Sequence, residues 1–196
     1  MMAQKIPYAS LVQTPWKNGA GSSTEIVAFP PGAGFDDFDW RISLASIASS
    51  AAFSVFPGID RTLSLVAGDG VQLEIDDQRL VALAAGAPTI AFAGELAVFA
   101  TVGSGPNPVS TDFNVMTKRS RCRHQFERLT APQTLNRRSG TTLLFLAEGE
   151  QIVLRGGQQH VALGRFDALL LGVDDPVNWS FAPAPGATVF VVDIFT

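Results

Sequence analysis

A glycine-rich segment near the start of the chain brings together a tryptophan, a lysine and an asparagine. The segment reads Thr14-Pro-Trp-Lys-Asn-Gly-Ala-Gly-Ser-Ser-Thr-Glu-Ile26. Glycines allow backbone N–H groups to approach a bound molecule closely, Lys17 supplies a compact positive charge, and Asn18 supplies both a hydrogen-bond donor and an acceptor. These residue types predict a ligand-binding loop just before a strand.

Two further segments each isolate one arginine among mostly uncharged residues. They read Trp40-Arg-Ile-Ser-Leu-Ala45 and Phe53-Ser-Val-Phe-Pro-Gly-Ile-Asp-Arg61. Together with Lys17, their arginines are the only basic residues between Ile6 and Gln78. Cations in apolar surroundings must reach solvent, pair with acids or meet an anionic ligand. The three cations therefore predict either ion pairs or a site for a negatively charged group.

The alternation of side chains along a strand predicts where two of these cations lie. Arg41 and Ser43 share one face of their segment, and the apolar residues between and beside them take the other. Arg61 follows a Pro-Gly turn and begins a strand, so we expect it near a rim of the β structure. The alternative is purely structural: Asp60 and Arg61 cap the turn, and Arg41 pairs with an acid, either Glu25 or one of Asp36, Asp37 and Asp39.

The composition excludes several classes of partner. The chain has 196 residues, of which 46% are hydrophobic, and a net charge of −4, so it can bury a full core and is a poor match for nucleic acid or an acidic membrane surface. The single cysteine, Cys122, cannot form an internal disulfide. The first 16 residues contain no long apolar run, and glycines and prolines interrupt the uncharged stretches at 80–94 and 96–111. We therefore expect a cytoplasmic protein without a membrane span.

Short runs of β-branched and aromatic residues, punctuated by 18 glycines and 12 prolines, predict an all-β fold. When the chain is shifted against itself by 80 residues, Thr62-Leu63 falls on Thr142-Leu143 and the segment 78–83 falls on 158–163. The strand pairing between these blocks fits better with a one-residue slip. The repeat predicts two β-barrels or sandwiches packed together, with domains at residues 1–118 and 119–196. Chance identity among common residues is the alternative.

A basic region joins the two predicted domains. Residues 118–138 hold half of the 14 basic residues, and Arg119, Arg121 and Arg123 recur with period 2, which would place them on one face of a strand. This face is either a solvated outer face or charged edge strand, or a surface that binds phosphate or acidic groups. A protein-interaction module that uses this region is a further alternative. The apolar strand 189–195 is covered by the other barrel or by a second subunit, which leaves a homodimer open.

Four sequence blocks resemble the signature of the HutD/Ves family. They are Pro15-Trp-Lys-Asn-Gly-x-Gly, Trp40-Arg-Ile-Ser, Phe53-Ser-x-Phe-Pro-Gly-Ile-Asp-Arg61 with Thr62-Leu63, and Asp112-Phe-Asn-x-Met116. The blocks lie within residues 6–118, and beyond them only the general β character matches. The resemblance implies a fold of two tandem cupin barrels. It also implies a place in bacterial histidine utilisation, where the family is thought to bind a small pathway compound and moderate the pathway. Ala20 departs from the family's Lys-Asn-Gly-Gly-Gly run.

Residues for metal or nucleophilic chemistry are scarce. Many cupins hold a transition metal with two or three histidines and a glutamate, usually beginning His-x-His, but this chain has only His124 and His160, far apart in the sequence. We therefore predict no metal and no other cofactor. Cys122 lies among arginines without a recognisable motif around it, and no serine lies in a Gly-x-Ser-x-Gly elbow.

With the resemblance, the leading hypothesis is a metal-free protein that binds a small carboxylate, such as an N-acylated glutamate or another histidine-degradation intermediate, and regulates without turnover. Cations would bind the carboxylate, because arginine offers a bidentate fork, and polar groups would orient an amide-like part. The alternative is a hydrolase or isomerase of the same pathway with Asp60 or Asp112 as general base. The predicted site comprises Lys17, Asn18, Arg41, Ser43, Phe56, Asp60, Arg61, Asp112 and Asn114.

Overall fold

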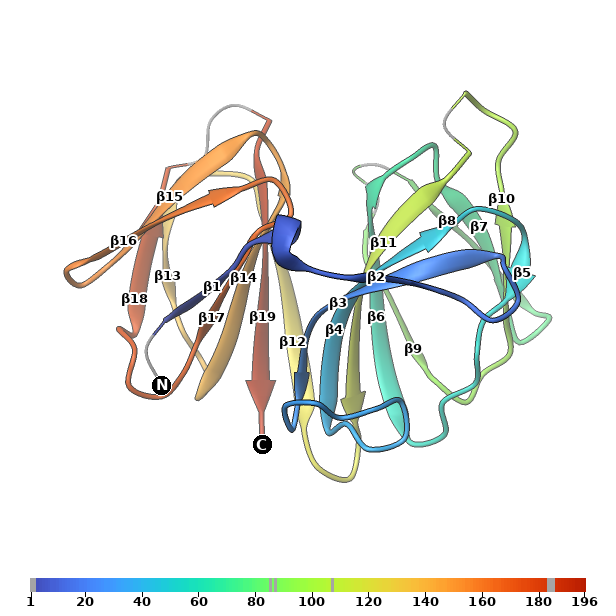
Figure 1. The fold of residues 1–196 in the computed structure, drawn as a ribbon, viewed down its shortest axis with the longest axis horizontal. Helices are drawn as coiled ribbons and strands as arrows, with labels where there is room; N and C mark the ends of the chain where they lie inside the picture. The colour runs from blue at the N-terminus through green and yellow to red at the C-terminus, as the bar shows by residue number, and fades with distance from the viewer. Residues whose placement is uncertain (1–2, 85, 87, 107, 183–185) are drawn as a thin grey trace. The chain divides into compact units, whose positions relative to one another are not determined.

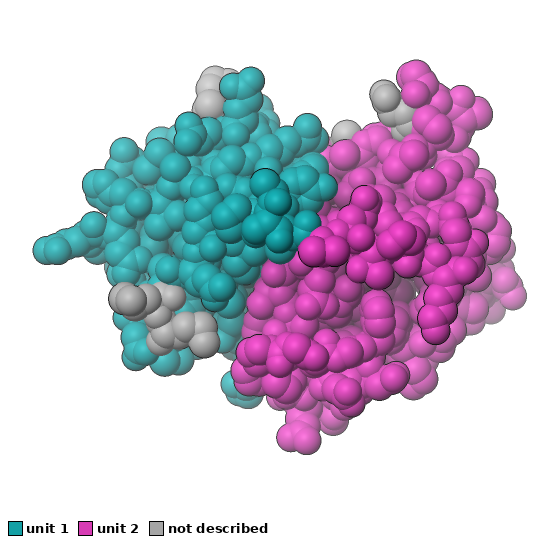
Figure 2. All heavy atoms as spheres, viewed as in Figure 1, with its two compact units in different colours: residues 1–11, 123–196 teal, residues 12–122 magenta. Residues whose placement is uncertain are grey.

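The computed structural model describes residues 3–84, 86, 88–106, 108–182 and 186–196. Their regular structure is β-strand apart from one short 3-10 turn, η1 (Tyr8–Ser10) (Figure 1). The prediction of an all-β fold is therefore confirmed. Among these residues no helix is long and apolar enough to cross a membrane. The chain divides by its internal contacts into two compact units, residues 12–122 and residues 1–11 with 123–196 (Figure 2).

The unit of residues 12–122, called unit 2, contains a large and a small antiparallel sheet. Strands of the large sheet lie in the order β2 (Gln13–Pro15), β3 (Gly21–Phe29), β4 (Trp40–Ile47), β11 (Ser110–Lys118), β6 (Ile59–Ala67) and β9 (Ile90–Ala93). The small sheet has the order β5 (Ala51–Ala52), β10 (Val98–Val102), β7 (Val71–Ile75) and β8 (Arg79–Leu83). Apolar side chains from both sheets form one core, with Leu63 and Leu65 from the large sheet and Leu73 from the small one.

The other unit, called unit 1, also contains two antiparallel sheets. One has the order β1 (Gln4–Ile6), β17 (Ala168–Leu171), β14 (Thr141–Glu148), β19 (Thr188–Phe195) and β12 (Arg123–Leu129). The second has the order β13 (Gln133–Asn136), β18 (Asn178–Phe181), β15 (Gln151–Gly156) and β16 (Gln159–Gly164). Leucine and valine side chains pack around the buried Trp179 in its core.

The pairing of strands in unit 2 recurs in unit 1. The ladders β4–β11–β6–β9 and β5–β10–β7–β8 correspond to β12–β19–β14–β17 and β13–β18–β15–β16. Strands β7 and β15 begin at Val71 and Gln151, which is the 80-residue shift expected from the sequence. The prediction of two tandem cupin barrels is confirmed only as an all-β fold, because the hydrogen-bonded sheets of the described residues are open at their edges.

The first residues of the chain contribute a strand to unit 1. Strand β1 pairs with β17, and Figure 1 shows it, in dark blue, beside that strand. Lys5 Nζ lies 2.9 Å from Asp167 Oδ2, and the Tyr8 N–H donates to Asp167 Oδ1 at 2.9 Å. The domain boundaries expected at 1–118 and 119–196 stay a prediction, because a division by contacts does not show which segments fold on their own.

Candidate functional site

The inner face of the large sheet in unit 2 carries a cluster of polar side chains. Residues directly opposite each other in a ladder point to the same face. Met116 of β11 lies between Arg41 and Arg61, and Asn114 lies between Ser43 and Leu63. Asp112 lies two residues further along the same face of β11. Leu63 belongs to the core, so the inner-face cluster, Arg41, Ser43, Arg61, Asp112 and Asn114, faces the inside of the unit.

Arg61 is one of the two buried cations of this cluster. Only 7% of its surface is exposed, and its guanidinium carbon lies 5.1 Å from the ring centre of Phe92, 5.3 Å from that of Phe53 and 5.8 Å from that of Phe56. Burial lowers the pKa of Arg61 to about 10, while the nearby Asp112 acts in the opposite direction. Arg61 is therefore charged at neutral pH, and its Nε atom has no hydrogen-bond partner among the described residues.

Asp112 and Asn114 add buried acceptors to this cation. Asp112 is 1% exposed, and neither of its carboxyl oxygens has a hydrogen-bond partner among the described residues. Oδ1 of Asn114 is likewise buried without a partner there. Burial raises the pKa of Asp112 to about 7, although Arg61 lowers it. Buried polar atoms without partners are costly, so a cluster of them marks a place where a ligand or ordered water completes the hydrogen bonds.

Arg41 differs from Arg61 because protein groups already satisfy it. Its Nε donates to Glu25 Oε2 at 2.8 Å, and its Nη1 donates to Ser43 Oγ at 3.0 Å. The expected pairing with Glu25 is thus confirmed. The ring of Phe35 lies 4.7 Å from the Arg41 guanidinium carbon. Glu25 therefore neutralises the charge of Arg41, and Ser43 helps to fix its position. Arg61 is then the cation of this cluster that is available to an anion.

Two loops bring aromatic rings over the cluster. Phe35 comes from the loop between β3 and β4, and Phe53 and Phe56 come from the loop between β5 and β6. The ring centres of Phe35 and Phe56 are 6.0 Å apart, and Phe35 is 55% exposed. Phe56, predicted as a wall of the site, therefore lies between Arg61 and an exposed ring. The loops give the cluster an aromatic border.

Lys17 and Asn18 do not join the inner-face cluster. Both are exposed in the turn that connects β2 with β3. Oδ1 of Asn18 accepts the Ala20 N–H at 3.0 Å, and Gly19 has a φ of 70°, so these residues shape the turn. Ala20 is not among the positive-φ residues, which explains how alanine replaces the family's glycine there.

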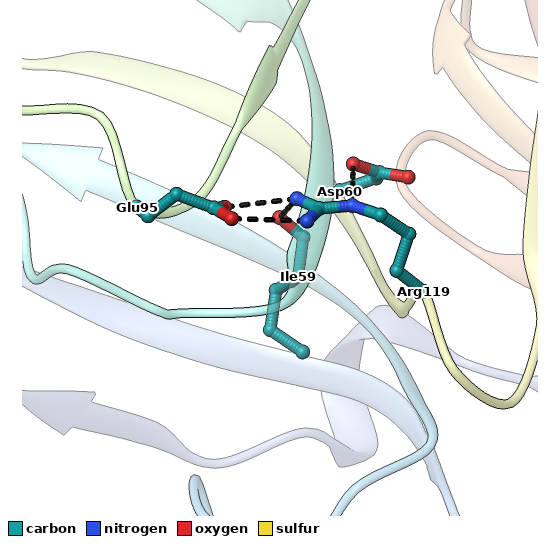
Figure 3. A network of polar contacts seen from close by, with 4 residues as sticks. All are labelled: Ile59, Asp60, Glu95 and Arg119. Carbon is teal, nitrogen blue, oxygen red and sulfur yellow. Dashed lines mark hydrogen bonds and ion pairs between the residues drawn. The ribbon is translucent and has the colours of Figure 1, made fainter.

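Asp60 lies on the other side of its strand from Arg61. Arg119 Nε donates to Asp60 Oδ1 at 2.8 Å, and Arg119 Nη2 donates to Glu95 Oε2 at 2.8 Å (Figure 3). The side chain of Asp60 is 45% exposed. The hydrogen bonds from Arg119 lower the pKa of Glu95 to about 2. Asp60 therefore takes part in an exposed ion-pair network and is separate from the inner-face cluster.

The expectation that Arg119, Arg121 and Arg123 share one strand face is wrong. Strand β11 ends at Lys118 and β12 begins at Arg123, with a turn between them. The turn forms because the Arg121 N–H and the Cys122 N–H both donate to the carbonyl of Lys118. Burial raises the pKa of the Cys122 thiol, which disfavours the thiolate.

Sequence reasoning missed the rings of Phe35, Phe53 and Phe92 as neighbours of the two arginines. Phe92 lies opposite Arg61 in the β6–β9 ladder, but the two residues are far apart in the chain and no motif connects them. Phe53 falls inside a signature block, which is the signal that could have identified it. The described residues bring no three His, Cys, Asp or Glu side chains together for a metal ion.

In unit 1, the buried polar groups at the matching positions are paired with other residues that the structure describes. In its ladder, Val189 and Val191 of β19 lie opposite Leu146 and Leu144 of β14 and belong to the core. Its buried Asp193 accepts from Thr142 Oγ1 at 2.5 Å and is thus paired. A surface depression of about 380 Å³ borders this unit, lined by Glu127, Leu129, Gln133, Thr134, Leu135, Asn136, Arg137 and Arg138. The inner-face cluster of unit 2 is the better candidate site, because several of its buried polar atoms have no hydrogen-bond partner among the described residues.

Known proteins resemble the chain over about half of its length or more. An uncharacterized 21.2 kDa protein from the hutC 3′ region of Pseudomonas putida is 34% identical over 161 residues, which cover 82% of each chain. Protein Ves of Citrobacter koseri is 44% identical over 108 residues, or 55% of this chain and 54% of that protein. The chain thus spans about half the length of this relative.

Solved structures agree with these relatives. HutD from Pseudomonas fluorescens SBW25 has a TM-score of 0.83 and 25% identity over 98% of both chains. A cupin 2 conserved barrel domain protein from Leptotrichia buccalis, with a TM-score of 0.60 and 10% identity over 98% of this chain and 96% of its own, shows a cupin-like fold. The HutD family model matches residues 8–189. The chain therefore belongs to the HutD family.

Proposed function

We propose that the protein binds a small carboxylate-bearing metabolite in the inner-face cluster of unit 2 and thereby modulates histidine utilisation. Membership of the HutD family links the chain to that pathway. The observation that carries the proposal is the buried Arg61: its Nε has no hydrogen-bond partner among the residues that the structure describes, and the same holds for the buried oxygens of Asp112 and Asn114. A carboxylate would satisfy the guanidinium, and N–H groups of the same ligand would satisfy the oxygens.

The chemistry of the cluster suits a ligand with both an acid and an amide-like group. Guanidinium binds carboxylate in a bidentate manner, and aromatic rings around Arg61 exclude water that would weaken the pairing. In this proposal, Asn114 and Ser43 orient a neutral polar group of the ligand. An N-acylated glutamate, or another carboxylated intermediate of histidine degradation, has these features. A role for Lys17 and Asn18 requires their exposed turn to contact the ligand, and it stays part of the proposal.

Isothermal titration calorimetry with N-acetyl-L-glutamate tests the proposal. Arg61→Met should weaken binding at least about tenfold, because a hydrogen bond to a charged group contributes roughly 1.5–3 kcal/mol. Arg119→Met is the matched control, since it removes an exposed guanidinium from the same unit and should keep wild-type affinity. Circular dichroism establishes that both variants are folded. Equal affinity of Arg61→Met and wild type, or equal loss in both variants, would place the ligand elsewhere.

A second function is favoured by one observation at Asp112. A carboxyl with a pKa of about 7 suits general acid–base catalysis near neutral pH, so a metal-independent hydrolase or isomerase is the alternative. Turnover of histidine-degradation intermediates by protein treated with chelator distinguishes the two functions. In the catalytic case the rate rises with pH through 7 and falls at least about a hundredfold in Asp112→Asn. Binding without turnover supports the regulatory function.

A further inference from the structure

When Asp112 is ionised, its charge and those of its neighbours are balanced before any ligand binds. Arg61 on β6 and Arg41 on β4 are the cations of the inner-face cluster, and Glu25 on β3 already pairs with Arg41. Ala45 and Leu65 lie directly opposite Asp112 on the neighbouring strands. The small sheet that packs against this face contributes apolar core residues. Other charged residues on these sheets and their turns are exposed in whole or part, and they include Asp60, Asp69, Glu74, Asp76, Asp77, Arg79 and Lys118.

A bound carboxylate would disturb this balance. Arg61 would then face two anions, the ligand and an ionised Asp112, inside a region that excludes water. Like charges in such a region repel strongly, and two carboxylates that share one site keep one proton between them. Neither Asp112 oxygen accepts a hydrogen bond from a described residue, so none of these residues stabilises the ionised form by donating to it. The proton shared by the two carboxylates would therefore reside on Asp112.

We infer that the carboxylate ligand binds together with one proton, which Asp112 holds and donates as a hydrogen bond to the ligand. This inference rests on the proposed function of the inner-face cluster. No covalent bond changes: the proton comes from solvent or is already on Asp112, and the ligand remains an anion bound to Arg61. Burial already raises the pKa of Asp112 to about 7, so the proton is taken up most visibly above that pH.

Titration calorimetry of the wild-type protein with N-acetyl-L-glutamate at pH 8 tests whether a proton is taken up on binding. The titration is carried out in HEPES and in Tris, because the ionisation heats of these buffers differ. We expect the observed heats to differ by the uptake of about one proton, and the affinity to fall about tenfold per pH unit above pH 8. Asp112→Asn keeps a donor but cannot titrate, so its binding should show no proton uptake and a flat pH profile. Asp60→Asn, a carboxylate on the opposite face of β6, should keep the wild-type proton uptake.

Infrared spectroscopy gives a readout that needs no ligand. The carbonyl band of a protonated carboxyl should be present at pH 5.5, decrease through about pH 7, and be absent from Asp112→Asn. An ionised Asp112 at pH 5.5 overturns the inference whether or not the probe binds. Binding with equal heats in both buffers overturns it while leaving the proposed function intact. Failure of the probe to bind wild-type protein counts against the proposed function and the inference together.

Discussion

At the residue scale, the surroundings give three acidic side chains of unit 2 different chemistry. Asp112 is buried beside one cation and has its pKa raised to about 7. Glu95 receives hydrogen bonds from Arg119 and has its pKa lowered to about 2. Asp60 shares Arg119 but lies half exposed on the opposite face of β6 from Arg61. Burial without a protein donor makes Asp112 the carboxyl that can exchange a proton near neutral pH.

The raised pKa of Asp112 predicts a pH dependence of stability. The folded protein binds the proton up to about pH 7, whereas an unfolded aspartate loses it near pH 3.9, so stability decreases as pH rises between these values. The effect is at most about 4 kcal/mol. Urea unfolding at pH 4.5 and 7.5 should show a free-energy difference between Asp112→Asn and wild type that grows with pH. A constant difference would mean that Asp112 is ionised throughout.

At the element scale, the glycine-rich segment stabilises the hairpin of β2 and β3. The Trp16 N–H donates to the Gly21 carbonyl and the Trp16 indole donates to Ser23 Oγ at 2.8 Å. A Cβ on Gly21 would collide with the backbone oxygen of Ser46 and approach the Trp16 ring to 2.9 Å. The close packing of backbone and ring against Gly21 therefore requires a glycine, independently of any ligand.

Gly21→Ala should accordingly destabilise the protein by about 1–3 kcal/mol, because a backbone oxygen in a sheet cannot move aside cheaply. Gly34→Ala is the control, since a Cβ there meets nothing within 4 Å and φ is not positive. Its effect should stay within about 1 kcal/mol. Thermal and urea unfolding measure both. Similar losses in the two variants would show that glycine flexibility, and not the Gly21 contact, sets the effect.

At the scale of the whole molecule, the division into two compact units does not follow the order of residues along the chain. Residues up to Leu11 belong with residues 123–196, although β2 begins only two residues later in the other unit. Asp167 holds this first segment through Lys5 Nζ, and through the Tyr8 N–H, and it also accepts the Gly164 N–H at 3.0 Å. These hydrogen bonds and the ion pair lower its pKa although burial opposes them.

Amide exchange should therefore follow the units and not the sequence. Residues 4–6 should open together with β17 and independently of β2. Asp167→Ala should accelerate their exchange and cost about 1–3 kcal/mol, because it removes several hydrogen bonds to a charged acceptor. Lys5→Met removes a partly exposed ion pair and an exposed hydrogen bond to the Ala162 carbonyl, and it should cost less than about 1 kcal/mol. Exchange of residues 4–6 in step with β2 would contradict the assignment of this segment to unit 1.

The sequence by itself determined the β class, the repeat and the family. It also placed Arg41 and Ser43 on one strand face. These features are local: a strand alternates with period 2 whatever it pairs with, and turn residues mark its ends. The same alternation already separates Asp60 from Arg61, yet both were included in the predicted site because they are neighbours in one block.

Only the tertiary structure decided which faces meet and what is buried. The position of Phe92 opposite Arg61, the pairing of Arg41 with Glu25 instead of a nearby aspartate, and the absence of donors to Asp112 among the described residues depend on register between strands far apart in the chain. Register is set by the packing of the whole sheet. The charge state of Asp112 follows from burial by both sheets of unit 2, and no local pattern of residues contains that information.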